Sequence, residues 1–404
     1  MHEPECRGVS LLTGSLPLPI EIVSRPVQLD VALQGMAGSQ AIVLDTESNS
    51  FHHYPEQLCL IQIATRHKVY IIDTIALKEL ASLKEVLADG SISKVIHGAD
   101  YDIRSLDRHY GFRIRNLYDT SIAARFSGIT QFGLAALIKD LLGITIHKSK
   151  RLQRADWGRR PLSAEALEYA ATDVRHLLAL REILDQRLRT LGRAAWVAEE
   201  CARIGEVRYT TPNLETANLS VKGAKDLDGH GLAVLQSLFL FREEEARRQH
   251  RPPFMVLPDT TLIFLATSPE VSLSMVPDLG QTGLKRFGQG LQQALRKGIT
   301  APPIHRPRLM KVVRASKEQI QRLSRLKEWR TSLGSSLSLD PSLLWPLTSL
   351  ERLAKAPDTL SIELTSGEVR HWQRDVVASS LCCNPNCQTN VKTFTERLND
   401  DWVF

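Results

Sequence analysis

The sequence predicts an α/β fold for the first half of the chain and all-α folds for the remainder. Short apolar runs of strand length lie before about residue 120, whereas helical spacing of apolar residues continues to residue 381. The length of 404 residues is enough for about two to three domains. We therefore expect domains at 20–208, 228–300 and 310–381.

The first expected domain alternates strands with helices. We expect strands at 41–44, 58–64, 69–72, 94–96 and 113–117. We expect helices at 75–88, 100–110 and 134–142, and a long helix from Ser163 to about residue 188. The first three strands are joined by connections too short for a crossover helix, so they pair antiparallel. The fourth strand lies between two helices and adds parallel pairing, which makes the sheet mixed.

The second half of the chain is predicted to be helical. A polar stretch at 209–229, with Pro212 and two glycines, predicts a linker. Beyond it we expect helices at 232–249, 260–267 and 284–297, a proline-containing linker at 299–309, and helices at 319–333, 341–354 and 368–381. The two groups of helices are similar in length, which suggests two related modules in tandem.

The chain carries a formal net charge of +6, and this charge is unevenly distributed. Between Arg296 and Arg330, eleven basic residues are offset only by Glu318 and Glu328, so this segment carries +9. Such an excess fits a track for a nucleic-acid backbone better than an ordinary solvated surface. A track of this kind binds phosphates and gives no sequence specificity by itself.

The sequence also indicates where the protein is located. No run of about 18 apolar residues is present, which argues against a membrane-spanning helix. Glu3 and Glu5 stand where a secretory peptide carries positive charge. The six cysteines are scattered rather than arranged as a disulfide framework. These features predict a cytoplasmic protein.

Carboxylates recur at the ends of the expected strands and inside one helix. Asp45 and Glu47 are two residues apart at the end of the first strand, so both point to the same side of the sheet. Asp102 follows the fourth strand, and Tyr169 and Asp173 share a helix face because they are four residues apart. An isolated Asp-x-Glu is most often a pair of exposed acids. Three such sites in this order form a specific pattern.

This pattern resembles the DEDDy group of 3′-5′ exonucleases and, within it, the ribonuclease D family. The resemblance extends to residues 94–102 (KVIHGADYD), 117–120 (LYDT), 156–157 (DW) and 160–162 (RPL), and it covers residues 20–205. It implies a ribonuclease-H-like fold in which a mixed five-stranded sheet brings the distant acids together.

The helical part of the chain has a resemblance of its own. Residues 235–248, with RPPF at 251–254 and LPD at 257–259, resemble the helicase-and-ribonuclease-D C-terminal (HRDC) domain. Residues 310–381, with LDP at 339–341, are similar to a second and more divergent copy. The resemblance thus implies an exonuclease domain followed by one or two all-α HRDC-like domains. Two copies favour bacterial ribonuclease D over its eukaryotic exosome-associated relatives.

The resemblance implies that two divalent metal ions bind to Asp45, Glu47, Asp102 and Asp173. Asp45 would bridge both ions. Glu47 and Asp173 would hold the ion that activates water, and Asp102 would serve the other ion. Tyr169 would orient the attacking water. Carboxylate oxygens suit Mg²⁺ or Mn²⁺, and four acids in one cleft would repel one another without cations.

Several neighbouring residues have both a structural and a functional interpretation. For Asp100 and Asp119 we favour helix capping over metal binding. For His97 we favour a hydrogen-bonded structural role over contact with the substrate. Trp157 is expected to be packed rather than stacked on a base.

The loop before the Tyr169 helix is strongly basic. Its cationic side chains, offset only by Asp156, are Lys148, Lys150, Arg151, Arg154, Arg159 and Arg160. Because phosphate contacts dominate nucleic-acid affinity, we expect this loop to grip the RNA backbone. The expected substrate contacts are His97, Lys148, Gln153 and Arg154.

Three cysteines gather near the end of the chain. Cys382, Cys383 and Cys387 follow His371, and these residue types are common zinc ligands. Their spacing lacks a matching second pair, so we do not expect a zinc site here.

Together these features predict a metal-dependent exoribonuclease, and the resemblance implies that it acts in the 3′-5′ direction. The resemblance implies hydrolysis to nucleoside 5′-monophosphates and action on structured RNA such as tRNA precursors, and we expect a monomer. Two alternatives stay open. One is a DNA 3′-5′ exonuclease of the same group, because no residue clearly reads a 2′-hydroxyl. The other is a nucleic-acid-binding scaffold without activity, against which the four intact acids argue.

Overall fold

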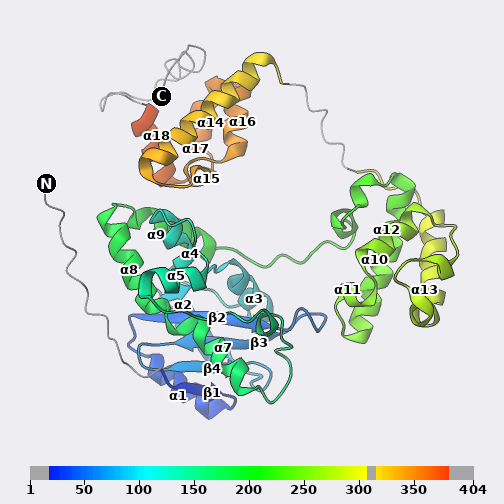
Figure 1. Cartoon of the computed structure of the whole chain (residues 1–404), viewed down its shortest axis with the longest axis horizontal. Helices are drawn as coiled ribbons and strands as arrows, with labels where there is room; N and C mark the ends of the chain where they lie inside the picture. The colour runs from blue at the N-terminus through cyan, green and yellow to red at the C-terminus, as the bar shows by residue number, and fades with distance from the viewer. Residues whose placement is uncertain (1–17, 307–314, 382–404) are drawn as a thin grey trace.

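The computed structural model describes residues 18–306 and 315–381 (Figure 1). Strands β1 to β6 and helices α1 to α9 form the first part of the chain, and two groups of helices follow. This arrangement confirms the predicted α/β fold with all-α units after it. Cys382, Cys383 and Cys387 of the zinc alternative, and Arg308, Lys311 and Arg314 of the basic segment, lie outside the described residues. No helix within the described ranges is long and apolar enough to cross a membrane.

The sheet has six strands in the order β1-β4-β3-β2-β5-β6. Their bounds are Ile20–Val23 (β1), Ala41–Ser48 (β2), Leu58–Ala64 (β3), Val69–Asp73 (β4), Ser93–Ile96 (β5) and Leu117–Asp119 (β6). β2, β3 and β4 pair antiparallel, as predicted, and β1, β5 and β6 add parallel pairs. Every residue of β3 and β4 is buried, so these two strands form the centre of the core.

Two strands differ from the prediction. The prediction of five strands misses β1, a run of only four residues (IEIV) that pairs with β4 at the edge of the sheet. So short a run carries too little periodicity to be recognised. The prediction of a strand at 113–117 is wrong, because Asn116 adopts a left-handed φ of 53° and the strand starts only at Leu117.

Helices α1 to α9 surround this sheet. Their bounds are Pro26–Met36 (α1), Ala81–Ala88 (α2), Asp100–Tyr110 (α3), Thr120–Phe126 (α4), Leu134–Leu142 (α5), Lys150–Gln153 (α6), Ala164–Arg175 (α7), Leu177–Thr190 (α8) and Ala194–Gly205 (α9). The helices predicted at 100–110 and 134–142 are confirmed. The helix predicted at 75–88 begins only at Ala81. The Asp73 carboxylate accepts hydrogen bonds from the Ile75 and Ala76 N–H groups, and this turn competes with the helix.

The long helix predicted at 163–188 is in fact two helices. Ser163 caps α7 as expected, since its hydroxyl accepts a hydrogen bond from the Ala166 N–H, but α7 ends at Arg175 and the chain bends at His176. No glycine or proline marks this bend. Tertiary packing accounts for it, because α7 lies on β2, β3 and β4 whereas α8 packs on β2, β5, α4 and α5.

The first helical unit adjoins the stretch predicted as a linker. It contains α10 (Gly229–Gln249), α11 (Pro253–Val256), α12 (Asp259–Thr267), a 3₁₀ turn (Leu273–Met275) and α13 (Gly280–Thr300). The linker prediction for 209–229 is partly wrong, because 3₁₀ turns at Ala217–Ser220 and Ala224–Asp226 bury Val221 and Ala224 in the core of this unit. Burial of these apolar side chains stabilises the 3₁₀ turns although most residues of the stretch are polar.

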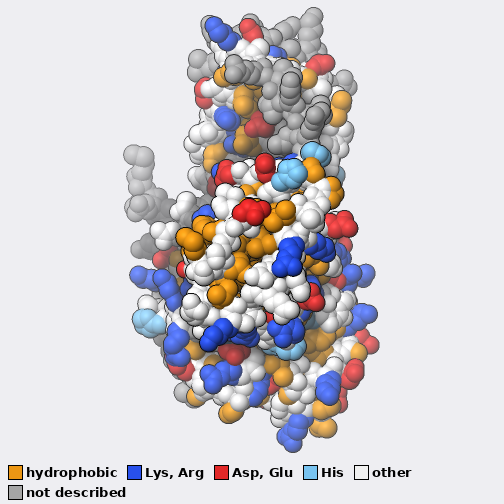
Figure 2. Space-filling view, turned by 90° about the vertical axis from the view of Figure 1, so that its right-hand side faces the viewer, with side chains coloured by type: hydrophobic (Ala, Val, Ile, Leu, Met, Phe, Trp, Pro, Cys, Tyr) orange, Lys and Arg blue, Asp and Glu red, His pale blue; other side chains and the backbone are white. Residues whose placement is uncertain are grey.

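Figure 2 looks at the side of the molecule that carries the first helical unit. Apolar side chains gather on this side, with Lys and Arg around them.

The second helical unit contains helices of the same lengths as the first three helices of the first unit. It contains α14 (Lys317–Leu337), α15 (Pro341–Leu344), α16 (Leu347–Lys355), a 3₁₀ turn (Pro357–Thr359), α17 (Leu360–Thr365) and α18 (His371–Leu381). α10 and α14 have 21 residues each, α11 and α15 four, and α12 and α16 nine. Arg242 and Arg330 occupy the same position of their helices, and each donates to the carbonyl before a proline, Leu257 at 3.1 Å and Trp345 at 3.0 Å. The two units thus share the lengths of three successive helices and one arginine contact.

The second helical unit packs on α9 and α4 of the sheet domain. Trp372 of α18 stacks on Trp196 of α9 with ring centroids 4.9 Å apart, and it meets Phe126 edge-on. The Glu199 carboxylate accepts hydrogen bonds from the N–H groups of His371 (2.8 Å) and Trp372 (3.1 Å), and it thereby satisfies the first turn of α18. Aromatic stacking and a charged hydrogen-bond acceptor thus hold the unit in place.

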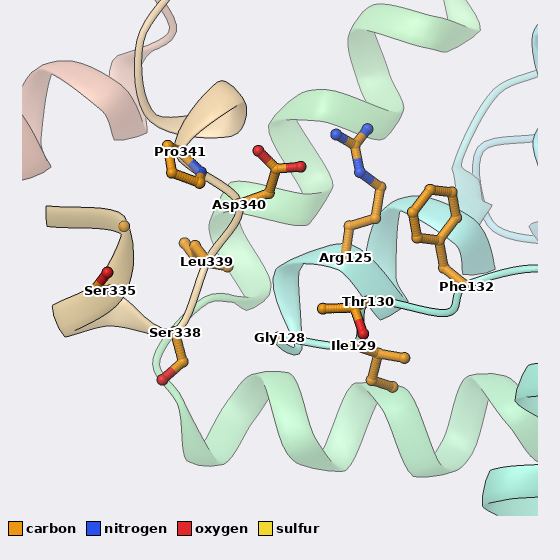
Figure 3. A pocket seen from close by; sticks show the side chains of 11 residues that line it. Arg125, Gly128, Ile129, Thr130, Phe132, Ser335, Ser338, Leu339, Asp340 and Pro341 are labelled. Atoms are coloured by element: carbon orange, nitrogen blue, oxygen red, sulfur yellow. The ribbon is translucent and has the colours of Figure 1, made fainter. Parts of the chain in front are cut away.

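A pocket of about 510 Å³ lies beside this contact (Figure 3). Arg125 and Phe132 line it from the sheet domain, and the guanidinium of Arg125 lies 5.4 Å from the centre of the Phe132 ring. Ser338 and Asp340 line it from the second helical unit. None of the acids predicted as metal ligands is among its lining residues, so the pocket marks the contact between the two parts of the chain rather than the acidic cluster.

Candidate active site

The end of β2 carries two of the acids. Asp45 and Glu47 alternate with Thr46, so their carboxylates leave the same face of the sheet. The pairing of β2 with β3 shifts between Glu47 and Ser48, and this irregularity ends the regular ladder directly after the acids. Both carboxylates therefore lie where the strand leaves the core.

Asp102 reaches the same region from the first turn of α3. Gly98, with a φ of 74°, turns the chain after β5, and Asp119 accepts hydrogen bonds from the N–H groups of Gly98 (3.0 Å) and Ala99 (2.8 Å). Asp119 also caps α4, so its predicted structural role is confirmed. The Thr46 hydroxyl donates to the Asp102 carboxylate at 2.5 Å, and this bond ties α3 to β2.

The capping role predicted for Asp100 is wrong. Ala99 is the N-cap residue of α3, and Asp100 already belongs to the helix. Its carboxylate pairs with Arg104 at 2.9 Å on the exposed surface. Asp119 instead binds the N–H groups of Gly98 and Ala99 in the turn that precedes α3.

α7 brings Tyr169 and Asp173 to the acids. The helix lies on β2, β3 and β4, and both side chains are buried. The Lys148 ammonium nitrogen lies 2.9 Å from Asp173 Oδ1, and Tyr169 also hydrogen-bonds to this carboxylate. Of the predicted substrate contacts, Lys148 is thus the one that is ion-paired with an acid of the cluster.

The carboxylates of this cluster disfavour one another's ionisation. Burial raises the pKa of Asp45 well above its usual value, and the charges of Asp102 and Asp173 raise it further. Burial raises the pKa of Glu47 to about 10, together with the charges of Asp45, Asp173 and Asp102. Burial also raises the pKa of Asp102 to about 7, although the hydrogen bond from Thr46 opposes this shift. An acidic cluster of this kind is stabilised by cations.

The donor set fits hard divalent cations. Carboxylate oxygens are the preferred ligands of Mg²⁺ and Mn²⁺, and the cluster offers four carboxylates. Within residues 18–306 and 315–381, no three His, Cys, Asp or Glu side chains already surround a single point as metal ligands. The four acids nevertheless come from elements that adjoin one another: Thr46 of β2 is hydrogen-bonded to Asp102, and α7, which carries Asp173, packs on β2. The Lys148 ammonium supplies positive charge 2.9 Å from Asp173 Oδ1.

Comparison with known proteins identifies the architecture. Residues 20–189 match the 3′-5′ exonuclease family, and residues 231–295 match the HRDC domain. The chain is 31% identical to ribonuclease D of Desulfotalea psychrophila over 340 residues, which span 82% of this chain and 87% of that protein. It is 33% identical to ribonuclease D of a Shewanella species over 70% of this chain and 74% of that protein. The chain belongs to the ribonuclease D family.

Membership in the ribonuclease D family makes this chain a 3′-5′ exoribonuclease. The comparisons do not favour the two alternatives, a DNA exonuclease and a silent scaffold. The crystal structure of Escherichia coli RNase D has the same fold over almost the whole chain, with a TM-score of 0.70, 24% identity, and coverage of 94% of this chain and 99% of that one. The fold shared with that enzyme therefore extends beyond the sheet domain.

A loop of this ribonuclease D family member supports Tyr169. Trp157 is 1% exposed, and its ring centroid lies 6.0 Å from that of Tyr169, so Trp157 is packed as predicted. Arg160 donates from Nε to Asp73 Oδ2 at 2.5 Å and from Nη2 to Asp73 Oδ1 at 2.7 Å. Its Nη1 donates to the Trp157 carbonyl at 2.7 Å. The bidentate pair thus fixes the loop that carries Trp157 to the end of β4.

These contacts correct the prediction for the basic loop. Arg160 was expected to grip RNA phosphates, but its guanidinium is committed to Asp73 and to backbone carbonyls. Arg151 likewise pairs with Glu165 on the surface. Asp73 was not predicted as a functional residue, although an acid at the end of an apolar strand is visible in the sequence.

The other predicted substrate contacts differ in their surroundings. His97 Nδ1 is 2.9 Å from the Thr120 hydroxyl, and burial lowers the pKa of His97 to about 4, in agreement with the favoured structural interpretation. Gln153 and Arg154 are exposed at the end of α6, and the Arg154 guanidinium lies 6.0 Å from the centre of the Phe51 ring. His97 lies close enough to Lys148 for the Lys148 charge to contribute to the lowered pKa of His97.

Two exposed aromatic residues near the acids were not singled out in the sequence. Tyr101 precedes Asp102 and is 47% exposed, and its hydroxyl lies 2.7 Å from the Ser48 hydroxyl. Phe51 follows the end of β2 and is also 47% exposed. Their sequence proximity to the acids was the only available signal, because solvent exposure is not visible in a sequence.

Proposed function

We propose that this exoribonuclease releases nucleoside 5′-monophosphates from RNA 3′ ends in a reaction that needs two divalent metal ions, Mg²⁺ or Mn²⁺. The residues proposed to hold the ions are Asp45, Glu47, Asp102 and Asp173. Tyr169 is proposed as the catalytic residue that orients the attacking water. The observation that carries this proposal is the placement of the acids: Asp45 and Glu47 leave the same face of β2, Asp102 is hydrogen-bonded to Thr46 of β2, and α7, which carries Asp173, packs on β2.

The side chains around the acids have separate tasks in this proposal. Bound ions polarise the phosphate and lower the pKa of a water molecule. Burial and the charge of Asp173 raise the pKa of Tyr169, so its phenol stays protonated and can hold the attacking water by hydrogen bonding. Lys148 can exchange its contact with Asp173 for a phosphate oxygen of the substrate.

We propose structured RNA such as tRNA precursors as the substrate class, with the chain acting as a monomer in the cytoplasm. His97, Lys148, Gln153 and Arg154 remain the proposed substrate contacts. The basic segment between Arg296 and Arg330 is proposed to track the RNA backbone. The proposed domains are 20–208, 228–300 and 310–381, the last a divergent HRDC-like unit, and the matching contacts of Arg242 and Arg330 support that assignment.

The test is cleavage of 5′-labelled RNA and DNA oligomers of equal sequence in the presence of Mg²⁺, Mn²⁺ or a chelator. We expect a metal-dependent ladder that shortens from the 3′ end, on RNA in preference to DNA. Asp173→Asn should abolish it while RNA binding persists, because asparagine keeps the size but loses the anionic charge. Asp140→Asn, on the exposed side of α5, is the matched control. Normal turnover of Asp173→Asn would refute the assignment of the site.

A further inference from the structure

Gln62 is a polar residue at the centre of the most buried strand of the sheet. It lies in the middle of β3, its exposed fraction is 0%, and all other residues of the strand are apolar. Within the described residues, neither Nε2 nor Oε1 of its carboxamide has a hydrogen-bond partner. A buried amide without partners is costly, and native proteins seldom keep one without a reason.

The register of the sheet shows what lies next to this amide. Gln62 is the direct cross-strand partner of Asp45 on β2, and its partner on the other side, in β4, is Ile71. Directly opposed residues of an antiparallel pair point to the same face of the sheet, with Cβ atoms roughly 4.5–5.5 Å apart. α7, which carries Tyr169 and Asp173, packs on β2, β3 and β4. Asp45 is therefore the polar cross-strand neighbour of Gln62.

Gln62 also has the reach to meet Asp45. Two methylene groups separate its carboxamide from the backbone. The last torsion angle of a glutamine side chain has a broad distribution, so the amide can turn within its site. Asp45 and Gln62 have complementary chemistry, because a carboxylate only accepts hydrogen bonds and the amide nitrogen donates two. Ile71 offers neither a donor nor an acceptor on the other side.

We propose that Gln62 is a positioning residue for Asp45, whose carboxylate it orients toward the ions by donating a hydrogen bond from Nε2. This inference rests on the proposed role of Asp45 as a metal ligand. Groups that hold a metal ligand in place without touching the metal typically contribute a factor of 10–100 to metal affinity. A glutamine suits this task in a buried strand, because it orients the carboxylate without adding a charge.

The test measures Mn²⁺ binding by calorimetry on the full chain without RNA, for Gln62→Met and Gln62→Leu. Both variants keep the side-chain volume and remove the amide. We expect Mn²⁺ affinity to fall about 10–100-fold, RNA affinity to stay unchanged, and excess Mn²⁺ to restore part of the turnover. Ile63→Met, in the neighbouring buried position on the opposite face of β3, is the matched control and should bind Mn²⁺ as the wild type does.

The outcomes separate this inference from the function on which it rests. If Asp45→Asn loses Mn²⁺ binding while both Gln62 variants bind Mn²⁺ like the wild type, the role of Gln62 is refuted and the metal site stands. If Asp45→Asn binds Mn²⁺ normally, the metal site itself is refuted. If neither Gln62 variant folds, the amide serves the stability of the sheet and the positioning role is likewise overturned.

Discussion

Exchange of Arg160 for lysine tests whether the loop that carries Trp157 positions Tyr169. Lysine keeps the positive charge but cannot reproduce the planar fork of arginine. The fork donates to both oxygens of Asp73 and to the Trp157 carbonyl, at 2.5, 2.7 and 2.7 Å. Hydrogen bonds to charged groups contribute roughly 1.5–3 kcal/mol each. Lysine can keep one of these bonds. The Arg160 side chain is 26% exposed, and solvent weakens the bonds that are lost. We therefore expect the free energy of unfolding to fall by about 2 kcal/mol.

The effect on catalysis separates positioning from simple destabilisation. A displacement of about 1 Å in a group that orients reactants costs up to roughly 100-fold in rate. We therefore expect kcat of Arg160→Lys to fall about 10–100-fold, while KM for a short RNA and the affinity for Mn²⁺ stay unchanged. Single-turnover cleavage and urea unfolding measure the two effects. Arg159→Lys, at the exposed neighbouring position, is the control. Equal turnover of the two variants would refute the role of this loop.

The same ion pair has a pH signature. Burial opposes the ionisation of Asp73, but the hydrogen bonds and charge of Arg160 outweigh it and hold the pKa of Asp73 below 3.8. A carboxyl group whose pKa is lowered by folding stabilises the fold above its unfolded-state pKa, and this stabilisation is lost as the pH falls through the folded-state pKa. The wild type should therefore lose stability more steeply below about pH 4 than Arg160→Lys does. Parallel acid-unfolding curves would contradict this account.

The helical units provide three more tests. Trp372→Ala removes a buried ring that stacks on Trp196, so urea unfolding should show a loss of about 3–5 kcal/mol; an unchanged midpoint would contradict the packing of α18 on α9. Hydrogen bonds from Arg352 lower the pKa of Glu363, so the α14–α18 unit should lose stability as the pH falls below 4.5, and Glu363→Gln should reduce this dependence. Deletion of residues 228–404 should flatten the salt dependence of RNA binding, and equal slopes would refute the proposed RNA track.

Much of the sheet could be predicted because its signals are local. The antiparallel β2, β3 and β4 follow from apolar runs joined by short connections, and the bounds of α3 follow from helical spacing. β1 could not be recognised because four residues carry almost no periodicity. The bend at His176 was missed because it arises from the packing of α7 and α8 on different strands, and such packing leaves no mark at the bend itself.

The acidic site was predictable in composition but not in its supporting contacts. Asp45, Glu47 and the other acids can be recognised in the sequence, because charged residues at the ends of strands and helices are candidate metal ligands. In the sequence, by contrast, Gln62 is only one polar residue in an apolar strand. Its position opposite Asp45 follows from the register of β2 and β3, which the sequence does not give. The sequence also shows which residues are charged but not which partners their side chains meet. Arg160 lies among basic residues and so indicated phosphate binding.

The partner of Arg160 is Asp73, 87 residues earlier in the chain. Such a pair forms because β4 ends beside the loop before α7, a proximity set by the order of the strands rather than by local sequence. The acids likewise come from segments that are far apart in the chain. β2, α3 and α7 each contribute carboxylates that disfavour one another's ionisation. A site of this kind must be held by contacts outside the cluster, and the Arg160–Asp73 pair, the Thr46–Asp102 hydrogen bond and the Asp119 cap are such contacts.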